Sequence, residues 1–215
     1  GDLTPHPVSR FLLGFFHALN QGKSNHDHHL INVINHGPHS CTNWFEPLKS
    51  IELTDVSALP IQAKVAAVRD LGLDLAIDLS GWTSGHFLGG FLAKLAPVQC
   101  SYLGFFASTG IHEIDYWLGD WSLFPADYNG WHTETLWRLD RPFLAWQPVD
   151  PLPEATLNVM PAPSGPIRFG SFNHNRKLSD QTLRLWGRIL DAVPESTLVL
   201  KANASSDLAT QELLR

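Results

Sequence analysis

The sequence predicts an α/β fold with parallel sheets, divided between two lobes. Apolar strand-like runs alternate with amphipathic helical segments along most of the 215 residues. This alternation is typical of β-α-β units, in which helices cover both faces of a parallel sheet. It breaks at 148–166, a stretch rich in proline, and resumes afterwards. The chain is therefore expected to contain a domain boundary in that stretch.

Four helical segments are predicted from apolar residues that recur three and four positions apart. In the first segment Val8, Phe11, Leu12 and Phe15 lie on one face, and Pro7 suits a first helical turn. A glycine ends the second segment, and two glycines weaken the third. The predicted helical segments are 7–19, 61–71, 86–96 and 179–193.

The strands are predicted from short apolar runs bounded by glycine, proline or other turn residues. Ligands of parallel sheets bind outside the carboxyl ends of the strands, so the loops that leave strands are the places to search for function. The predicted strands are 30–34, 73–79, 98–105, 114–120, 135–140, 167–172 and 196–201.

The domain organisation follows from these elements. Residues 1–147 are expected to form an N-terminal lobe, 148–166 a linker, and 167–215 the start of a C-terminal lobe. A single β-α-β unit follows the linker, and one such unit cannot bury its own faces. We therefore expect the C-terminal lobe to be truncated in this chain.

Composition excludes several classes of protein. Hydrophobic residues make up 44% of the chain and charged residues 17%, with a net charge of -6. This balance suits a packed core and argues against nucleic-acid binding, which needs a basic face. The chain shows neither an apolar run near ~18 residues nor a secretory leader, so a cytoplasmic protein without membrane contact is expected.

Metal and disulfide sites are not expected either. Cys41 and Cys100 are not spaced as a zinc or disulfide pair. The histidine-rich run 26–29, with His36 and His39 nearby, matches no familiar metal site and is interpreted as a polar loop.

The loop within FGSFNHNRKLSD, residues 169–180, joins a predicted strand to a predicted helix. Ser179 is a good N-cap, and Asp180 suits the positive end of the helix dipole. Backbone N–H groups at this helix start, next to Arg176 and Lys177, predict an anion site. The alternative is a solvated, capped turn, since the loop lacks the glycine pattern of a nucleotide-binding motif.

Three other segments carry polar side chains beside strand or helix ends. His6 precedes the first helix, where it is either a cap or a base. Asp78 ends a strand and is followed by Ser80, Gly81, Trp82 and Thr83, a pattern that fits a substrate-facing edge or a helix-capping turn. The segment 103–116 leaves another strand with small and hydroxyl residues, whose backbone can approach a ligand closely.

Together, HPVSRF, DLSGWTSG, LAPVQCSYLGFFASTGIHEIDYWLGD and FGSFNHNRKLSD resemble the catalytic region of the O-linked N-acetylglucosamine transferases and their bacterial homologues, with the plant SPINDLY proteins as close cousins. The resemblance covers nearly the whole chain. It implies a GT-B-type glycosyltransferase with two Rossmann-like lobes. The first strand of the N-terminal lobe is expected to be missing from this chain. It also implies tetratricopeptide repeats upstream.

The resemblance implies roles for individual residues. Lys177 matches the lysine that contacts the donor diphosphate, and Asn173 and His174 lie in the same donor-binding group. His6 matches a histidine that acts as general base or positions the acceptor, and Asp78 an acidic residue that helps carry the proton away. The remaining residues, assigned to the acceptor cleft, are Trp82, Thr83, Ser108 and Thr109. Trp82 stands where the family has His or Tyr, and Ala107 where it has glycine.

The implied activity is transfer of N-acetylglucosamine from UDP-N-acetylglucosamine (UDP-GlcNAc) to Ser or Thr hydroxyls of proteins, with inversion and without a cofactor or required metal. Two alternatives stay open. One is a related protein O-fucosyltransferase or O-glucosyltransferase with another donor. The other is a truncated, non-catalytic interaction module.

Overall fold

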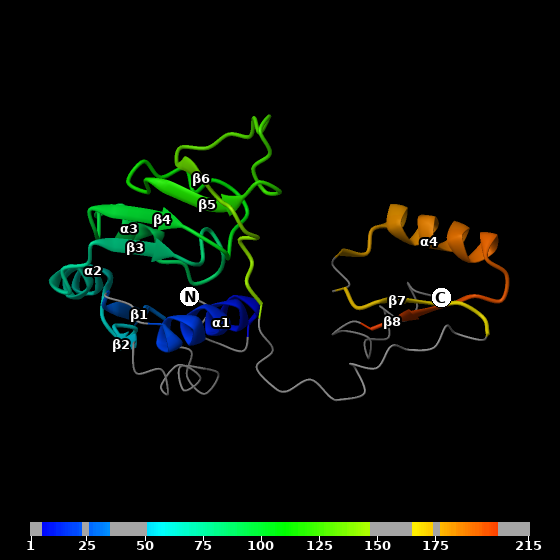
Figure 1. Ribbon diagram of the computed structural model, residues 1–215, viewed down its shortest axis with the longest axis horizontal. Coiled ribbons are helices and arrows are strands. Elements are labelled where there is room, and N and C mark those ends of the chain that lie inside the picture. Colours follow the sequence, from blue (N-terminus) through cyan, green and yellow to red (C-terminus); the bar gives the residue numbers. More distant parts are fainter. Residues whose placement is uncertain (1–5, 23–25, 35–50, 147–164, 174–176, 202–215) are drawn as a thin grey trace. The chain divides into compact units, whose positions relative to one another are not determined.

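The structure is a computed structural model, and it describes residues 6–22, 26–34, 51–146, 165–173 and 177–201. Its contacts divide the chain into two compact units, Gly1–Leu152 and Pro153–Arg215. Figure 1 shows both units. Nearly all of the predicted linker 148–166 lies outside the described residues, so its conformation stays a prediction.

The first unit is built on parallel strands, as the sequence predicts. One sheet has two strands in the order β1-β2, and another has four in the order β3-β4-β5-β6; every pair in both is parallel. In Figure 1 the four strands stack in that order. The elements are α1 (Pro7–Gln21), β1 (His28–Asn32), β2 (Ile51–Asp55), α2 (Ile61–Asp70), β3 (Leu75–Asp78), α3 (Leu88–Phe91), β4 (Val98–Ser101), β5 (Tyr116–Asp120) and β6 (Thr135–Leu139).

Two elements differ from the sequence prediction. Strand β2 was not predicted, although Ile51 and Leu53 alternate with polar residues as in a half-buried strand. The helix predicted at 86–96 is a single turn, α3. Lys94 has φ +55°, which is incompatible with a helix that continues to 96. Within the single turn, Gly90 packs so closely on the Phe87 ring that a Cβ would clash.

Of the apolar face predicted for α1, Val8 and Leu12 are buried and Phe11 is half-buried, but Phe15 is 48% exposed, so the prediction is wrong for that residue. Val8, Leu12, Leu13 and Phe16 pack with Leu30 of β1 and with Leu103, which follows β4. This cluster fixes the start of α1 beside the carboxyl ends of the strands. A second cluster fills the space around α2, α3 and the strands, and its members include Val33, Val56, Val68, Ala76, Phe87, Leu88, Phe91, Leu95, Ala96, Ile111 and Ile114.

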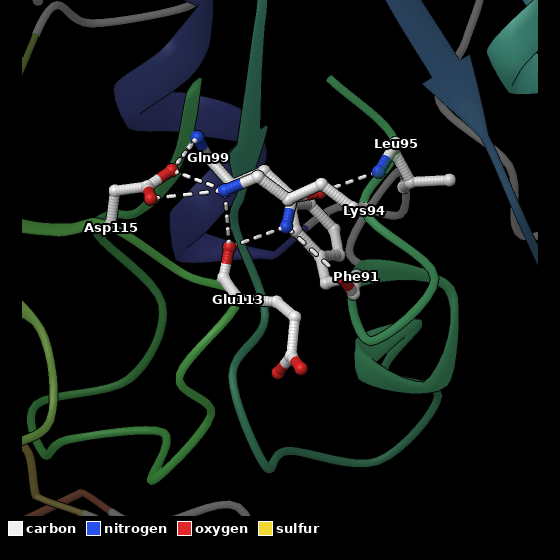
Figure 2. A network of polar contacts seen from close by, with 6 residues as sticks. All are labelled: Phe91, Lys94, Leu95, Gln99, Glu113 and Asp115. Atoms are coloured by element: carbon white, nitrogen blue, oxygen red, sulfur yellow. Dashed lines mark hydrogen bonds and ion pairs between the residues drawn. The ribbon is translucent and has the colours of Figure 1, made fainter. Parts of the chain in front are cut away.

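A polar network fixes the amino end of β4 (Figure 2). The Gln99 side chain is 0% exposed, and both of its polar side-chain atoms form hydrogen bonds. Its Oε1 accepts the Leu95 N–H at 2.8 Å, and its Nε2 donates to the carbonyls of Phe91 at 3.0 Å and Glu113 at 2.7 Å. The glutamine of the PVQ sequence is therefore a structural residue that joins two turns.

Lys94 and Asp115 complete this network. Lys94 Nζ lies 2.7 Å from Asp115 Oδ2 and donates to the Glu113 carbonyl at 3.0 Å. The same Asp115 oxygen accepts the Gln99 N–H at 2.8 Å. Burial alone would raise the pKa of Asp115, but the Lys94 and Gln99 hydrogen bonds outweigh it and lower that pKa. The aspartate of the DY sequence is thus ionised and structural.

The second unit contains the predicted β-α-β segment. Strands β7 (Arg168–Ser171) and β8 (Thr197–Leu200) are parallel neighbours, and α4 (Asp180–Ala192) connects them. Ser179 caps α4 through its Oγ, which accepts the Thr182 N–H at 3.2 Å. The described side chains of α4 are half-buried or exposed. Across the described residues of both units, no helix has the length and apolar character needed to cross a membrane.

Candidate active site

His6 lies at the start of α1 as its N-cap. Its Nδ1 accepts the Val8 N–H at 3.4 Å, and the side chain is exposed. The helix start also packs on the loops that leave β3 and β4, because a Cβ added to Gly104 would lie 3.4 Å from the Val8 side chain and 2.0 Å from the Leu79 carbonyl oxygen. His6 is therefore held on the segment that packs against the carboxyl ends of two strands.

Asp78 is the last residue of β3, opposite Ser101 of β4. Its side chain is only 4% exposed, and its Oδ2 accepts the Gly81 N–H at 2.6 Å. Gly81 has φ +52°, which favours glycine in this turn. Burial raises the pKa of Asp78, and the Gly81 and Ser80 backbone hydrogen bonds oppose this rise without cancelling it. Asp78 thus holds the turn and has an increased proton affinity.

Asparagine at position 78 should leave the free energy of unfolding at pH 7 unchanged or increase it. Asparagine keeps an oxygen for the Gly81 N–H and removes a buried charge. Asp78→Ala should instead reduce that free energy by about 1–3 kcal/mol, because the buried Gly81 N–H loses its partner. Denaturant unfolding of the two variants measures both effects.

The same variants should differ in their pH dependence. A carboxyl whose pKa is raised on folding stabilises the fold fully below its unfolded pKa, and this contribution is lost as the pH rises through its folded pKa. Stability of the wild-type chain should therefore lose this contribution as the pH rises above about 4, and Asp78→Asn should not show the loss. Parallel stability curves for wild type and Asp78→Asn would contradict this assignment.

The loop after β3 is connected to the loop after β4 through Trp82. Thr83 Oγ1 donates to the Ser80 carbonyl at 2.7 Å, which closes the turn. The indole Nε1 of Trp82 donates to the Thr109 carbonyl at 2.8 Å, while the side chain remains 52% exposed. His86 meets the indole ring in an edge-on contact, with centroids 5.1 Å apart. Trp82 therefore presents a fixed aromatic surface.

Both predicted hydroxyl residues of the loop after β4 are bonded to Glu134, which the sequence analysis did not single out. Ser108 Oγ donates to Glu134 Oε2 at 2.6 Å, and the Thr109 N–H donates to Oε1 at 2.7 Å. The Thr109 hydroxyl also donates to Oε1. Glu134 precedes β6 and is 25 residues from Thr109, so spacing along the chain gives no sign of the contact.

The second unit places Lys177 two residues before the Ser179 cap, with its side chain exposed. Asn173 Nδ2 donates to Ser171 Oγ at 3.3 Å at the end of β7. His174 and Arg176 lie outside the described residues. The described part of this loop thus places an exposed cation just before the start of α4, while the Asn173 amide is bonded at the end of β7.

The described residues contain no group of three or more His, Cys, Asp or Glu side chains arranged to hold a metal ion. In the histidine-rich segment, His29 Nδ1 lies 3.6 Å from Glu52 Oε2, which joins β1 to β2. His28 and His29 belong to β1, so the interpretation of 26–29 as a polar loop is wrong for these two residues.

Comparison with known proteins identifies relatives, although no family model matches the chain. A probable UDP-N-acetylglucosamine–peptide N-acetylglucosaminyltransferase SPINDLY from Solanum lycopersicum is 35% identical over 150 residues, 68% of this chain and 16% of the relative. The SPINDLY protein of Oryza sativa is 39% identical over 144 residues, which are 65% of this chain and 15% of the relative. The corresponding SEC protein of Arabidopsis thaliana is 26% identical over 208 residues, 93% of this chain and 21% of the relative.

A solved structure agrees with these sequences. A mutant of the Thermobaculum terrenum O-GlcNAc transferase matches with a TM-score of 0.84 and 31% identity, over 100% of this chain and 39% of that one. This match confirms the predicted α/β, GT-B-type fold class. The chain spans only a small part of each relative, 16% of the tomato protein. On these sequence and structural likenesses, it belongs to the O-linked N-acetylglucosamine transferase family.

Proposed function

We propose that this chain is part of the catalytic region of an inverting protein O-glycosyltransferase, which transfers N-acetylglucosamine from UDP-GlcNAc to Ser or Thr of protein substrates. The observation that carries the proposal is the packing of the α1 start, with His6, on the exits of β3 and β4, where Asp78 lies. The names of the relatives support this choice of reaction.

The reaction needs a group that handles the acceptor proton. In inversion, the hydroxyl oxygen attacks the anomeric carbon, the bond to the diphosphate breaks, and the hydroxyl proton leaves. A neutral imidazole has a single lone pair, and that of His6 accepts the Val8 N–H. If His6 acted as the base, its Nδ1 lone pair would take up the proton and the hydrogen bond from the Val8 N–H would be lost. If Nε2–H instead donated to the acceptor oxygen, that hydrogen bond would remain. The geometry favours His6 as the group that positions the acceptor.

Asp78 then becomes the better candidate for proton transfer. Its raised pKa brings its proton affinity closer to the range useful for a general base near neutral pH. On the donor side, Lys177 stabilises the diphosphate as negative charge develops on it, beside the N–H groups at the start of α4. The proposed reaction uses no cofactor or metal, because the lysine and the helix start supply the positive charge.

A transfer assay tests the proposed function. The full-length protein, incubated with UDP-GlcNAc and Ser/Thr peptides, should modify the peptide with inverted anomeric configuration and in the presence of EDTA. Mass spectrometry and NMR of the product measure these outcomes. Transfer only from GDP-fucose or UDP-glucose would overturn the donor assignment, and absence of transfer from any sugar nucleotide would overturn the enzyme assignment.

Variants of His6 separate its cap from its role in transfer. His6→Ala should lower the free energy of unfolding by about 1 kcal/mol, and His6→Asn should restore it, because asparagine is a good N-cap. Both variants should lower turnover at least about tenfold with donor affinity retained. Wild-type turnover in His6→Asn would remove the imidazole from the mechanism and leave it a structural cap.

A further inference from the structure

Glu134 is a buried carboxylate that lies outside every predicted site. Its side chain is 2% exposed, and it is among the largest fully buried side chains of the described residues. Oε1 accepts from the Thr109 N–H and the Thr109 hydroxyl, and Oε2 accepts from Ser108 Oγ. Oε2 also lies 3.2 Å from both the N–H and the hydroxyl of Thr133. Both oxygens are therefore fully bonded.

These contacts explain how a charge can be buried at this position. Desolvation alone would raise the pKa of Glu134, but the hydrogen bonds from Ser108 and Thr109 outweigh it and lower that pKa. The carboxylate is therefore ionised at neutral pH, and its donors are held more strongly than a neutral acceptor would hold them. A buried charge with this many partners gives its loop one geometry.

The loop that contains Ser108 and Thr109 is also bonded to the loop that leaves β3. Ser108 Oγ also accepts the Gly110 N–H at 3.1 Å, and Thr109 Oγ1 lies 3.3 Å from the Ile111 nitrogen. The Thr109 carbonyl, fixed by these contacts, accepts the Trp82 indole N–H. Trp82 in turn follows directly after Gly81, whose N–H donates to Asp78 Oδ2. A continuous set of bonds thus runs from Glu134 to the exit of β3.

We propose that Glu134 is a positioning residue for the acceptor side of the site. It fixes the Thr109 carbonyl, and through that carbonyl it fixes the orientation of the Trp82 ring in the turn that follows Asp78. The proposal rests on the proposed function, because it assigns Trp82 and the 106–110 loop to the acceptor cleft. It adds that the Ser108 and Thr109 hydroxyls serve Glu134, so that this loop meets the acceptor through its backbone and through Trp82.

The test compares Glu134→Gln with Asp115→Asn in the full-length protein. Glutamine keeps the size of the side chain but turns an amide N–H₂ toward hydroxyl and N–H donors. Asp115→Asn is the matched control, because it also removes an ionised carboxylate with several donors, at the amino end of β4. Steady-state kinetics with varied peptide and varied UDP-GlcNAc give separate constants for the two substrates, and thermal unfolding gives the stability of each variant.

We expect Glu134→Gln to lower kcat/KM for the acceptor peptide by about 100-fold, the scale of a loop displaced by about 1 Å, with KM for UDP-GlcNAc changed less than about twofold. Asp115→Asn should lower the unfolding temperature comparably and leave the acceptor kcat/KM within about threefold of wild type. Unchanged acceptor kinetics in a folded Glu134→Gln protein would overturn the proposal. Equal losses in the two variants would also overturn it.

A second measurement does not depend on activity. In the full-length protein, amide exchange at Thr109 and the NMR shift of the Trp82 indole N–H should both change in Glu134→Gln and stay unchanged in Asp115→Asn. If wild type shows no transfer, the proposed function fails, and this measurement still decides whether Glu134 holds the loop. Wild-type exchange and an unmoved indole signal in Glu134→Gln would overturn the positioning role.

Discussion

Replacing Lys177 with alanine in the full-length protein should reduce sugar transfer by about 100- to 1,000-fold, the usual effect of removing one group that stabilises charge in a transition state. The diphosphate leaving group gains negative charge as the bond to the sugar breaks. The exposed ammonium of Lys177 lies two residues before the cap of α4, and under the proposed function it stabilises that charge. Arginine at this position should restore part of the activity, because it keeps the charge but differs in shape.

Transfer assays and donor titration of the same proteins measure this effect. The matched control is Arg188→Ala, which removes an exposed cation from α4 far along the helix from Ser179. It should keep wild-type turnover. Because Lys177 is exposed, the unfolding temperature should stay the same in both variants. Wild-type turnover in Lys177→Ala would contradict the proposed contact of Lys177 with the donor diphosphate. Equal losses of turnover in Lys177→Ala and Arg188→Ala would indicate a general effect of removing positive charge.

Replacing Gly104 with alanine should destabilise the first unit by about 2–4 kcal/mol, which is large for the addition of one methyl group. The added Cβ would lie 2.0 Å from the Leu79 carbonyl oxygen and 3.4 Å from the Val8 side chain. A backbone oxygen cannot rotate away as a side chain can, so the loops after β3 and β4 must separate. The start of α1 would lose its packing against them.

Denaturant unfolding of the 215-residue chain measures this change, with Gly89→Ala as the control. Gly89 lies in α3, and a Cβ there would meet no atom within 4 Å. Alanine favours a helix over glycine by about 0.5–1 kcal/mol, so the control should be neutral or slightly stabilised. A Gly104→Ala chain as stable as the control would mean that the two loops are not held as closely as the structure shows.

Much of the fold could be predicted because its elements have strong local signals. Helix α1 has a repeating apolar face and Pro7 in its first turn, and α4 has Ser179 as its cap, so both occur where the sequence places them. Helix α3 could not be predicted at its true length. The left-handed backbone of Lys94 prevents a longer helix, and the Lys94 side chain is bonded to Asp115, 21 residues away, so this feature is tertiary.

The candidate site divides in the same way. Asp78 and Trp82 were predicted because one ends a strand and the other lies in the turn after it, and a strand exit is recognisable in sequence. Glu134 was missed because it precedes a strand, and its partners Ser108 and Thr109 are 25 or more residues away. A carboxylate followed by an ordinary edge strand has no local feature that sets it apart. Such contacts are visible only when the chain is folded.

The network around Gln99 has a consequence for recognising distant homologues. Gln99 and Asp115 belong to the segment LAPVQCSYLGFFASTGIHEIDYWLGD that carries part of the family resemblance, yet they tie turns together at the amino end of β4. A descendant that had lost all activity could keep these letters as long as it kept its shape. Under the proposed function, His6, Asp78 and Lys177 would separate a working enzyme from a degenerate one better than these structural residues do.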